Sequence, residues 1–174
     1  MQTSYRSSAR ILLPVRPWFI ACSLAVALLL NLLPTAASPV LPDWLALVLV
    51  FWSVREPRRV GMGLAFLGGI AMDVADAGLL GQHALAYVLA VYGGGALSRR
   101  ILWFPLAEQA LHVLPLLLLV PLVQVVVRVI AGADFPGFGY FLGPLLATLL
   151  WPVLTFALLL PQHQPVDHDA NRPL

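Results

Sequence analysis

The sequence predicts an all-α polytopic membrane protein with about six transmembrane helices in a single domain. Of its 174 residues, 60% are hydrophobic and only 10% are charged, whereas a soluble domain carries roughly 25% charged residues. The apolar residues form long runs, and breaks rich in proline, glycine and arginine separate these runs. A surface so poor in charge is suited to lipid, and the length leaves little chain for a soluble domain.

Charge and cysteine content exclude several other classes of protein. The net charge is +2, and every basic residue is arginine. These arginines are too few and too scattered to form a nucleic-acid-binding patch. Cys22 is the single cysteine, which excludes both an intramolecular disulfide and a cysteine-based metal cluster.

The N-terminal region predicts a polar cytoplasmic tail, 1–16, followed by a first span over Trp18–Leu33. The span precedes Ala36-Ala37-Ser38, which is similar to the cleavage site of a secretory signal. We interpret the span as a membrane anchor instead, because Pro39 would follow the cut and further apolar runs follow.

The second helix is expected over Trp44–Val54, after a proline-rich turn at Pro34–Pro42. Asp43 directly precedes the apolar run, where an aspartate can cap a helix N-terminus. The run is shorter than the roughly 20 residues that cross a flat bilayer, so it predicts a thin or partly re-entrant span. A charged break at Arg55–Arg59 ends it.

Four further apolar runs complete the predicted transmembrane domain, 17–160. They cover residues 61–80, 84–97, 111–130 and 141–160. Pro115 and Pro121 interrupt the third of these runs, and neighbouring helices can satisfy the backbone carbonyls that such prolines free. The polar segment 161–174 predicts a disordered cytoplasmic tail.

The arginines predict the orientation of the spans. If six helices cross the membrane from a cytoplasmic N-terminus, nine of the ten arginines fall on the inner side and only Arg128 lies outside. The nine are Arg6, Arg10, Arg16, Arg55, Arg58, Arg59, Arg99, Arg100 and Arg172. This distribution follows the positive-inside rule and places both termini in the cytoplasm.

Two carboxylates stand inside the glycine-rich segment 61–92. Measured from a cytoplasmic start at Val60, Asp73 lies roughly 20 Å along the helix and Asp76 roughly 24 Å. Their spacing places them on one helical face. An aspartate at the centre of a span costs roughly 2.5–3.5 kcal/mol, so both must face protein, water or lipid headgroups.

Two interpretations of these carboxylates stay open. In the first, they organise a polar pocket or hold the following loop, with His83 and the Tyr87 hydroxyl as partners. In the second, Asp76 simply lies near the outer interface and Asp73 caps backbone in a bent hairpin. Asp73, Asp76 and His83 could supply metal ligands, but nothing in the sequence imposes their geometry, so we predict no metal and no cofactor.

The glycines predict close packing of helices. Small residues let membrane helices approach one another where no hydrophobic force drives association. The run Gly93-Gly94-Gly95 lacks the lysine and the preceding strand of a phosphate-binding loop. The predicted packing or partner-contact residues are Gly61, Gly63, Gly69, Gly78, Gly81, Tyr87, Gly93 and Gly94. No nucleophile-elbow, zinc-protease or P-loop motif occurs, so we do not expect an enzyme.

Three groups of residues carry a resemblance to a known family, over 39–100. They are Pro42-Asp43-Trp44 with Phe51-Trp52 and Arg55-Glu56-Pro57; Gly61-x-Gly63 with Phe66-x-x-Gly69-x-x-x-Asp73; and Gly78-x-x-Gly81-x-His83-Ala84-Leu85-x-Tyr87. This pattern resembles the bacterial rod shape-determining protein MreD family.

The resemblance implies a non-enzymatic scaffold in the bacterial inner membrane, within the elongation machinery that places peptidoglycan along the side wall. It implies MreC as the closest partner, docked through the glycine-rich helices. The MreB filament, a RodA-like glycosyltransferase and a class B transpeptidase would belong to the larger complex. It also implies a fold similar to the substrate-binding subunit of energy-coupling-factor transporters.

That similarity supplies an alternative function. A small-molecule, vitamin-type substrate-binding subunit of a transporter would also need a polar pocket that opens outward, and Asp73 with His83 could line one. Such sites need only a few convergent polar groups, so the sequence leaves both functions open.

Overall fold

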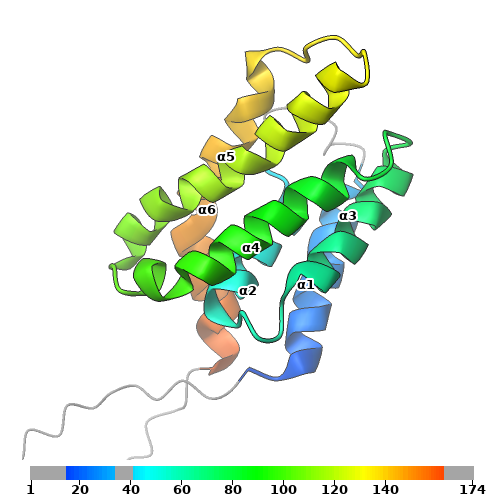
Figure 1. Ribbon diagram of the computed structural model, residues 1–174. Helices are drawn as coiled ribbons and strands as arrows, with labels where there is room; N and C mark the ends of the chain where they lie inside the picture. The colour runs from blue at the N-terminus through cyan, green and yellow to red at the C-terminus, as the bar shows by residue number, and fades with distance from the viewer. Residues whose placement is uncertain (1–14, 34–40, 163–174) are drawn as a thin grey trace, which may run out of the picture.

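The computed structural model describes residues 15–33 and 41–162, and within these ranges all regular secondary structure is helical, as predicted. Two short 3₁₀ helices, η2 (Phe138–Phe141) and η3 (Leu160–Gln162), flank the last α-helix. The α-helices are α1 (Pro17–Asn31), α2 (Trp44–Arg55), α3 (Met62–Ala75), α4 (Gln82–Leu102), α5 (Leu106–Ile130) and α6 (Leu142–Leu159) (Figure 1). Most of the predicted tails, 1–16 and 161–174, and most of the turn Pro34–Pro42 lie outside the described residues.

Several helix ends differ from the expected ones. Helix α3 ends at Ala75 instead of near Leu80, because the chain turns into a left-handed residue at Ala77. Helix α4 continues past the predicted end at Leu97 to Leu102. Helix α5 starts at Leu106, directly after Pro105, and keeps both internal prolines within one continuous helix.

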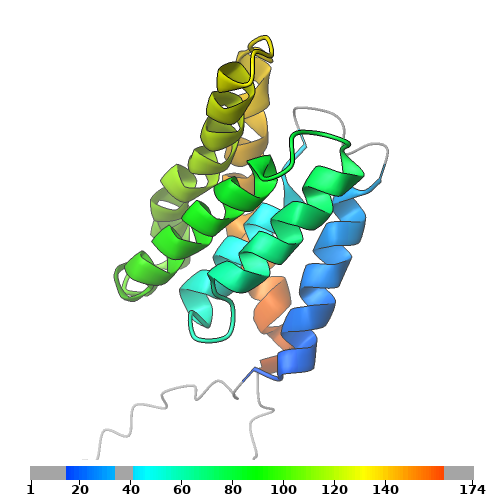
Figure 2. The same ribbon diagram turned by 45° about the vertical axis from the view of Figure 1, so that its right-hand side comes forward.

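The short helix α2 is the centre of the bundle. Every residue from Leu45 to Val54 is buried, and α2 packs against α1, α4, α5 and α6. Figures 1 and 2 show the other helices around it. A helix that is apolar on all sides belongs in an interior. Because protein and not lipid surrounds α2, its 12 residues need not match the thickness of a bilayer.

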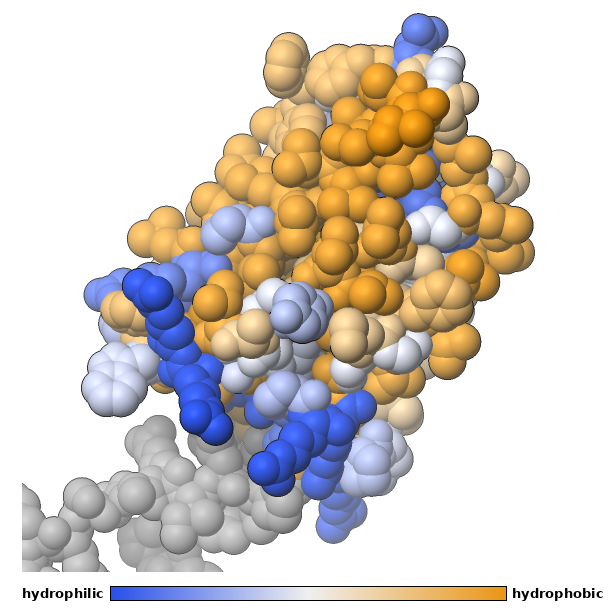
Figure 3. All heavy atoms as spheres, in the orientation of Figure 1, coloured by the Kyte–Doolittle hydropathy of each residue, from blue (hydrophilic) through white to orange (hydrophobic). Residues whose placement is uncertain are grey.

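The surface of the bundle is largely apolar. Hydrophobic residues cover most of the face in Figure 3, and hydrophilic ones gather at its lower end. In the part of the chain that the structure describes, two segments are long and apolar enough to cross a membrane, Leu106–Ile130 and Phe138–Leu159. Helices α1, α2 and α3 are apolar but shorter, so the six-span arrangement stays a prediction.

The glycines divide into two groups. A Cβ at Gly69 would overlap the backbone of Ala84, and one at Gly94 would overlap the Ser53 hydroxyl. A Cβ at Gly93 would lie 2.7 Å from a methyl group of Leu116. These three glycines therefore let α3 and α4 approach their neighbours.

The other predicted packing glycines have open space in place of a side chain. They are Gly61, Gly63, Gly78 and Gly81. The prediction that they pack against helices of this chain is wrong, because no neighbouring helix approaches within van der Waals distance of their missing Cβ atoms. Gly81 has a different role: its φ of +96° is a left-handed conformation that suits glycine.

Candidate functional site

Polar side chains gather at one end of the bundle, which we call the distal end. Here α1, α3 and α5 end and α2, α4 and α6 begin. The predicted cytoplasmic arginines Arg55, Arg99 and Arg100 lie at the opposite helix ends. Three hydrogen-bonded networks at the distal end surround a cavity.

The first network centres on Asp73, whose side chain is buried on α3. One carboxylate oxygen accepts hydrogen bonds from the backbone N–H and ring Nδ1 of His83, both at 2.8 Å. The other oxygen accepts the N–H of Gly81 at 2.8 Å. The first N–H groups of a helix have no partner within it. Asp73 therefore caps α4 from a neighbouring helix and also holds the loop between them.

The loop that Asp73 holds begins with a Schellman motif. The N–H of Gly78 bonds the carbonyl of Asp73, and the N–H of Ala77 bonds that of Val74. In this motif the residue after the C-cap adopts a left-handed conformation, and it is usually glycine. Here it is Ala77, with φ +48°. The turn redirects the chain two residues after α3 ends.

Asp76 lies on the other side of the His83 ring. Its carboxylate is 3.5 Å from Nε2, and its side chain is 47% exposed. Asp73 and Asp76 thus contact opposite nitrogens of one imidazole, so the three groups do not converge on a common point where an ion could sit. Within 15–33 and 41–162, no group of three histidine, cysteine or acidic residues could hold a metal ion.

The second network joins α1, α2 and α4 through Asp43. Its Oδ1 accepts the N–H of Ala46 at 2.9 Å, which is the expected helix cap. The same oxygen accepts the Asn31 side-chain amide at 2.7 Å, and Oδ2 accepts the Tyr87 hydroxyl at 2.7 Å. We expected the Tyr87 hydroxyl to bond Asp73 or Asp76. This expectation is wrong, because the hydroxyl donates its hydrogen bond to Asp43.

The third network joins α4, α5 and η2. The Nε of Arg128 donates to the side-chain oxygen of Gln82 at 3.2 Å, and its guanidinium lies 5.7 Å from the centre of the Tyr140 ring. The Tyr140 hydroxyl donates to Oε1 of Gln124 at 2.6 Å. Gln82 and Gln124 are both buried.

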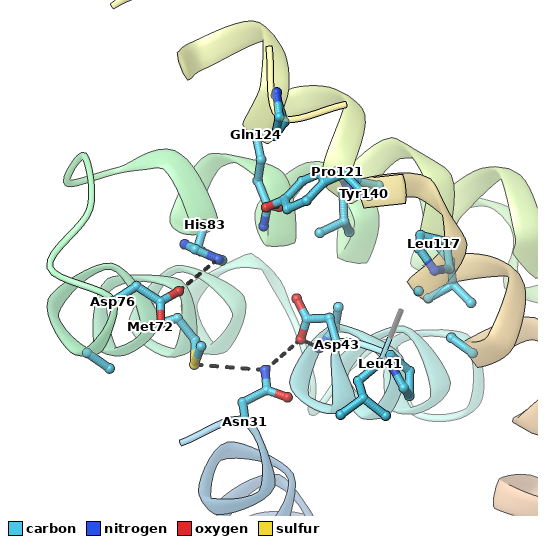
Figure 4. Close-up of a pocket in the computed structure, with 18 of the residues that line it drawn as sticks. Asn31, Leu41, Asp43, Met72, Asp76, His83, Leu117, Pro121, Gln124 and Tyr140 are labelled. Carbon is cyan, nitrogen blue, oxygen red and sulfur yellow. Dashed lines mark hydrogen bonds and ion pairs between the residues drawn. The ribbon is translucent and has the colours of Figure 1, made fainter. Parts of the chain in front are cut away.

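These networks enclose a distal cavity of about 550 Å³ (Figure 4). Of the three predicted pocket residues, Asp76 and His83 line it, whereas Asp73 lies behind His83 and does not. The other polar lining residues, which sequence reasoning did not assign to a pocket, are Asn31, Asp43, Gln124, Arg128 and Tyr140. Their common sequence feature is a polar residue at the distal end of each apolar run.

A second concavity, the α1/α3 groove, is apolar. It has a volume of about 250 Å³ and lies between α1 and α3, with α2 as its floor. Its lining residues are Leu24, Ala25, Leu28, Leu45, Leu49, Leu64, Leu67, Gly68 and Ala71.

Comparison with known proteins connects this architecture to a family. The family described as rod shape-determining protein MreD matches residues 13–161. A curated relative, the rod shape-determining protein MreD of Haemophilus influenzae, is 30% identical in an alignment 142 residues long. The match covers 78% of this chain and 85% of the relative. No solved structure matches the chain significantly. The chain therefore belongs to the MreD family of rod shape-determining membrane proteins.

Proposed function

We propose that this chain is a non-enzymatic scaffold of the cell-elongation machinery and that its α1/α3 groove receives the single transmembrane helix of an MreC-type protein. Membership of the MreD family supports the role in rod shape. The observation that carries the docking proposal is the groove itself. The family membership does not favour the vitamin-binding alternative.

The shape of the groove suits a helix. Its α3 residues, 64, 67, 68 and 71, recur at the spacing of one helical face. Leu24 and Leu28 on α1, and Leu45 and Leu49 on α2, are each four residues apart, so the groove runs along the helix axes. Ala25, Gly68 and Ala71 are small, which lets a third backbone approach closely. Gly61 and Gly63 precede the groove on α3 and are proposed partner contacts at its entrance.

The proposed topology has six spans in the bacterial cytoplasmic membrane, with both termini in the cytoplasm. Arginines at the ends of α2 and α4 support it, because they mark the end of the bundle opposite the distal cavity. A similarity to the substrate-binding subunit of energy-coupling-factor transporters stays a proposal. The MreB filament, a RodA-like glycosyltransferase and a class B transpeptidase are proposed members of the larger complex.

Filling the groove tests the docking proposal. Ala25 and Ala71 are exposed on the groove walls, and Ala96 is exposed on α4 away from it. The double variant Ala25→Leu/Ala71→Leu should fail to co-purify with the MreC-type protein of the same cells and should fail to restore rod shape. Ala96→Leu should behave like the unaltered chain.

Two outcomes contradict the proposal. One is retention of the partner by the double variant at the level of Ala96→Leu, with equal amounts of each in the membrane. The other is equal loss of the partner from both. If the double variant does not accumulate, Ala71→Leu alone provides the same comparison.

A further inference from the structure

The distal cavity contains charges of both signs, and the docking proposal does not use it. Its charged lining residues are Asp43, Asp76 and Arg128, together with the titratable His83. Two carboxylates would repel a simple anion in the cavity, and the guanidinium would repel a simple cation. A ligand that carries one positive and one negative group can pair with protein charges of both signs, provided that those protein groups still have free hydrogen-bond donors or acceptors.

Arg128 has that capacity. Its Nε is committed to Gln82 and its plane lies near Tyr140, which holds the guanidinium in place. Its two terminal nitrogens have no hydrogen bond or carboxylate partner among the described residues. Gln124 lies one turn earlier on the same face of α5, and its amide nitrogen is likewise without a partner in that part of the chain. Together they provide donors for an anionic oxygen.

The carboxylates differ in what they can still accept. Asp43 already accepts three hydrogen bonds, from Asn31, Ala46 and Tyr87, out of about four that a carboxylate can take. Asp76 has only a long contact to His83, and its side chain is half exposed. Asp76 is therefore the acid that is available to a cationic group.

The remaining walls of the cavity are apolar, including Met72, Leu117, Val120 and Pro121. In Figure 4, Gln124 and Tyr140 lie on one side of the space, Asn31 and Asp43 on another, and His83 with Asp76 on a third. The volume of about 550 Å³ falls in the range of small-ligand sites, roughly 300–1,000 Å³. It can hold a phospholipid headgroup and glycerol while the acyl chains stay in the bilayer.

We propose that the distal cavity binds a zwitterionic phospholipid that carries a primary ammonium, such as phosphatidylethanolamine. Its phosphate accepts hydrogen bonds from Arg128 and Gln124, and its ammonium group lies against Asp76. The apolar walls contact the glycerol and the first methylenes of the chains. A primary ammonium can donate hydrogen bonds to Asp76, which a choline headgroup cannot do and a glycerol headgroup does only without charge.

The test uses the delipidated full chain in neutral detergent and native mass spectrometry. Phosphatidylethanolamine, phosphatidylcholine and phosphatidylglycerol with identical acyl chains are compared by dissociation constant. We expect phosphatidylethanolamine to bind at least about fivefold more tightly than either other lipid, because hydrogen bonds to charged groups are the stronger ones. Equal binding of the three lipids would overturn the proposal without any variant.

Three variants assign the contacts. Arg128→Gln should weaken phosphatidylethanolamine binding by about tenfold. Asp76→Asn should reduce the preference over phosphatidylglycerol to less than about twofold. Arg99→Gln, at the opposite end of the bundle, should change neither. If Arg128→Gln binds phosphatidylethanolamine as tightly as Arg99→Gln does, the assignment of the phosphate to Arg128 is overturned. Melting curves recorded without lipid verify that each variant is folded.

A water-soluble headgroup separates a lipid from a free small zwitterion. Glycerophosphoethanolamine carries the same charged groups without acyl chains. We expect it to bind at least about a hundredfold more weakly than the lipid, because it buries little apolar surface. Equal affinity would overturn the lipid assignment.

Discussion

Asp73 on α3 bonds both the backbone N–H and the ring Nδ1 of His83 in the first turn of α4. One carboxylate thus caps a helix, orients an imidazole and fastens two helices that a short loop connects. Asp73 is 1% exposed, and its bonds to Gly81 and His83 explain why an ionisable group is buried near the end of α3 without any ligand.

Replacing Asp73 should therefore destabilise the hairpin strongly. Asp73→Ala leaves the N–H groups of Gly81 and His83 without their acceptor, and each unsatisfied buried donor costs about 1–3 kcal/mol. We expect a loss of about 2–4 kcal/mol in the free energy of unfolding, measured by denaturant titration in detergent. Asp76→Ala is the control: its exposed pair with His83 should contribute less than about 1 kcal/mol. Equal losses would show that Asp73 is not a cap.

The left-handed residue at the end of α3 offers a stabilising change. Ala77 has φ +48°, where a Cβ is strained and glycine is not. Ala77→Gly should raise the free energy of unfolding by about 0.5–1 kcal/mol. The converse change Gly81→Ala, at φ +96°, should lower it by about 1–2 kcal/mol. Destabilisation by Ala77→Gly would contradict the Schellman turn.

The contact between α3 and α4 depends on Gly69. Gly69→Ala would drive its methyl group into the backbone of Ala84, and overpacking of this kind costs about 1–3 kcal/mol. Gly63→Ala adds the same methyl group in open space on the same helix, and a better helix former there should be neutral or slightly stabilising. Thermal unfolding of the two variants distinguishes these effects. A tolerated Gly69→Ala would show that the helices are not in close contact.

One hydroxyl group adds a hydrogen bond to the packing of α4 against α2. Tyr87→Phe removes the donor to Asp43, and a hydrogen bond to a charged acceptor is worth about 1.5–3 kcal/mol. Tyr92→Phe, on the exposed side of α4, should change stability by less than about 0.5 kcal/mol. If the two variants unfold at the same denaturant concentration, Tyr87 does not hold α2.

Labelling of introduced cysteines tests the proposed topology. In a Cys22→Ser background, Gly78→Cys and Arg58→Cys place one thiol in each of two exposed loops. With six spans and a cytoplasmic N-terminus, a membrane-impermeant maleimide added to intact cells should label position 78 and spare position 58. The opposite pattern would invert the orientation.

Much of the fold was predictable because composition and local chemistry determine it. Asp43 before an apolar run predicted its own helix cap, and the structure confirms it. The end of α3 was missed because Leu79 and Leu80 continue the apolar pattern after the backbone has already turned at Ala77. Hydropathy does not detect a single left-handed residue.

The networks around the distal cavity were less accessible to sequence reasoning. Asp43 and Tyr87 are 44 residues apart, and Arg128 and Gln82 are 46 apart. Such residues become hydrogen-bond partners only through the way the helices pack, which the local sequence does not reveal. The i, i+3 spacing predicted that Asp73 and Asp76 share a helical face, and His83, one of their predicted partners, contacts both. The spacing could not show that one carboxylate would be buried and the other half exposed.

Photocrosslinking from the α1/α3 groove tests the central claim most directly. Leu67 lines the groove and is 66% exposed, whereas Leu149 is 74% exposed on α6. A photoreactive phenylalanine analogue at position 67 should form a covalent adduct with the transmembrane segment of the MreC-type protein in living cells, and one at position 149 should not. Adducts at position 149 with none at position 67 would contradict the account.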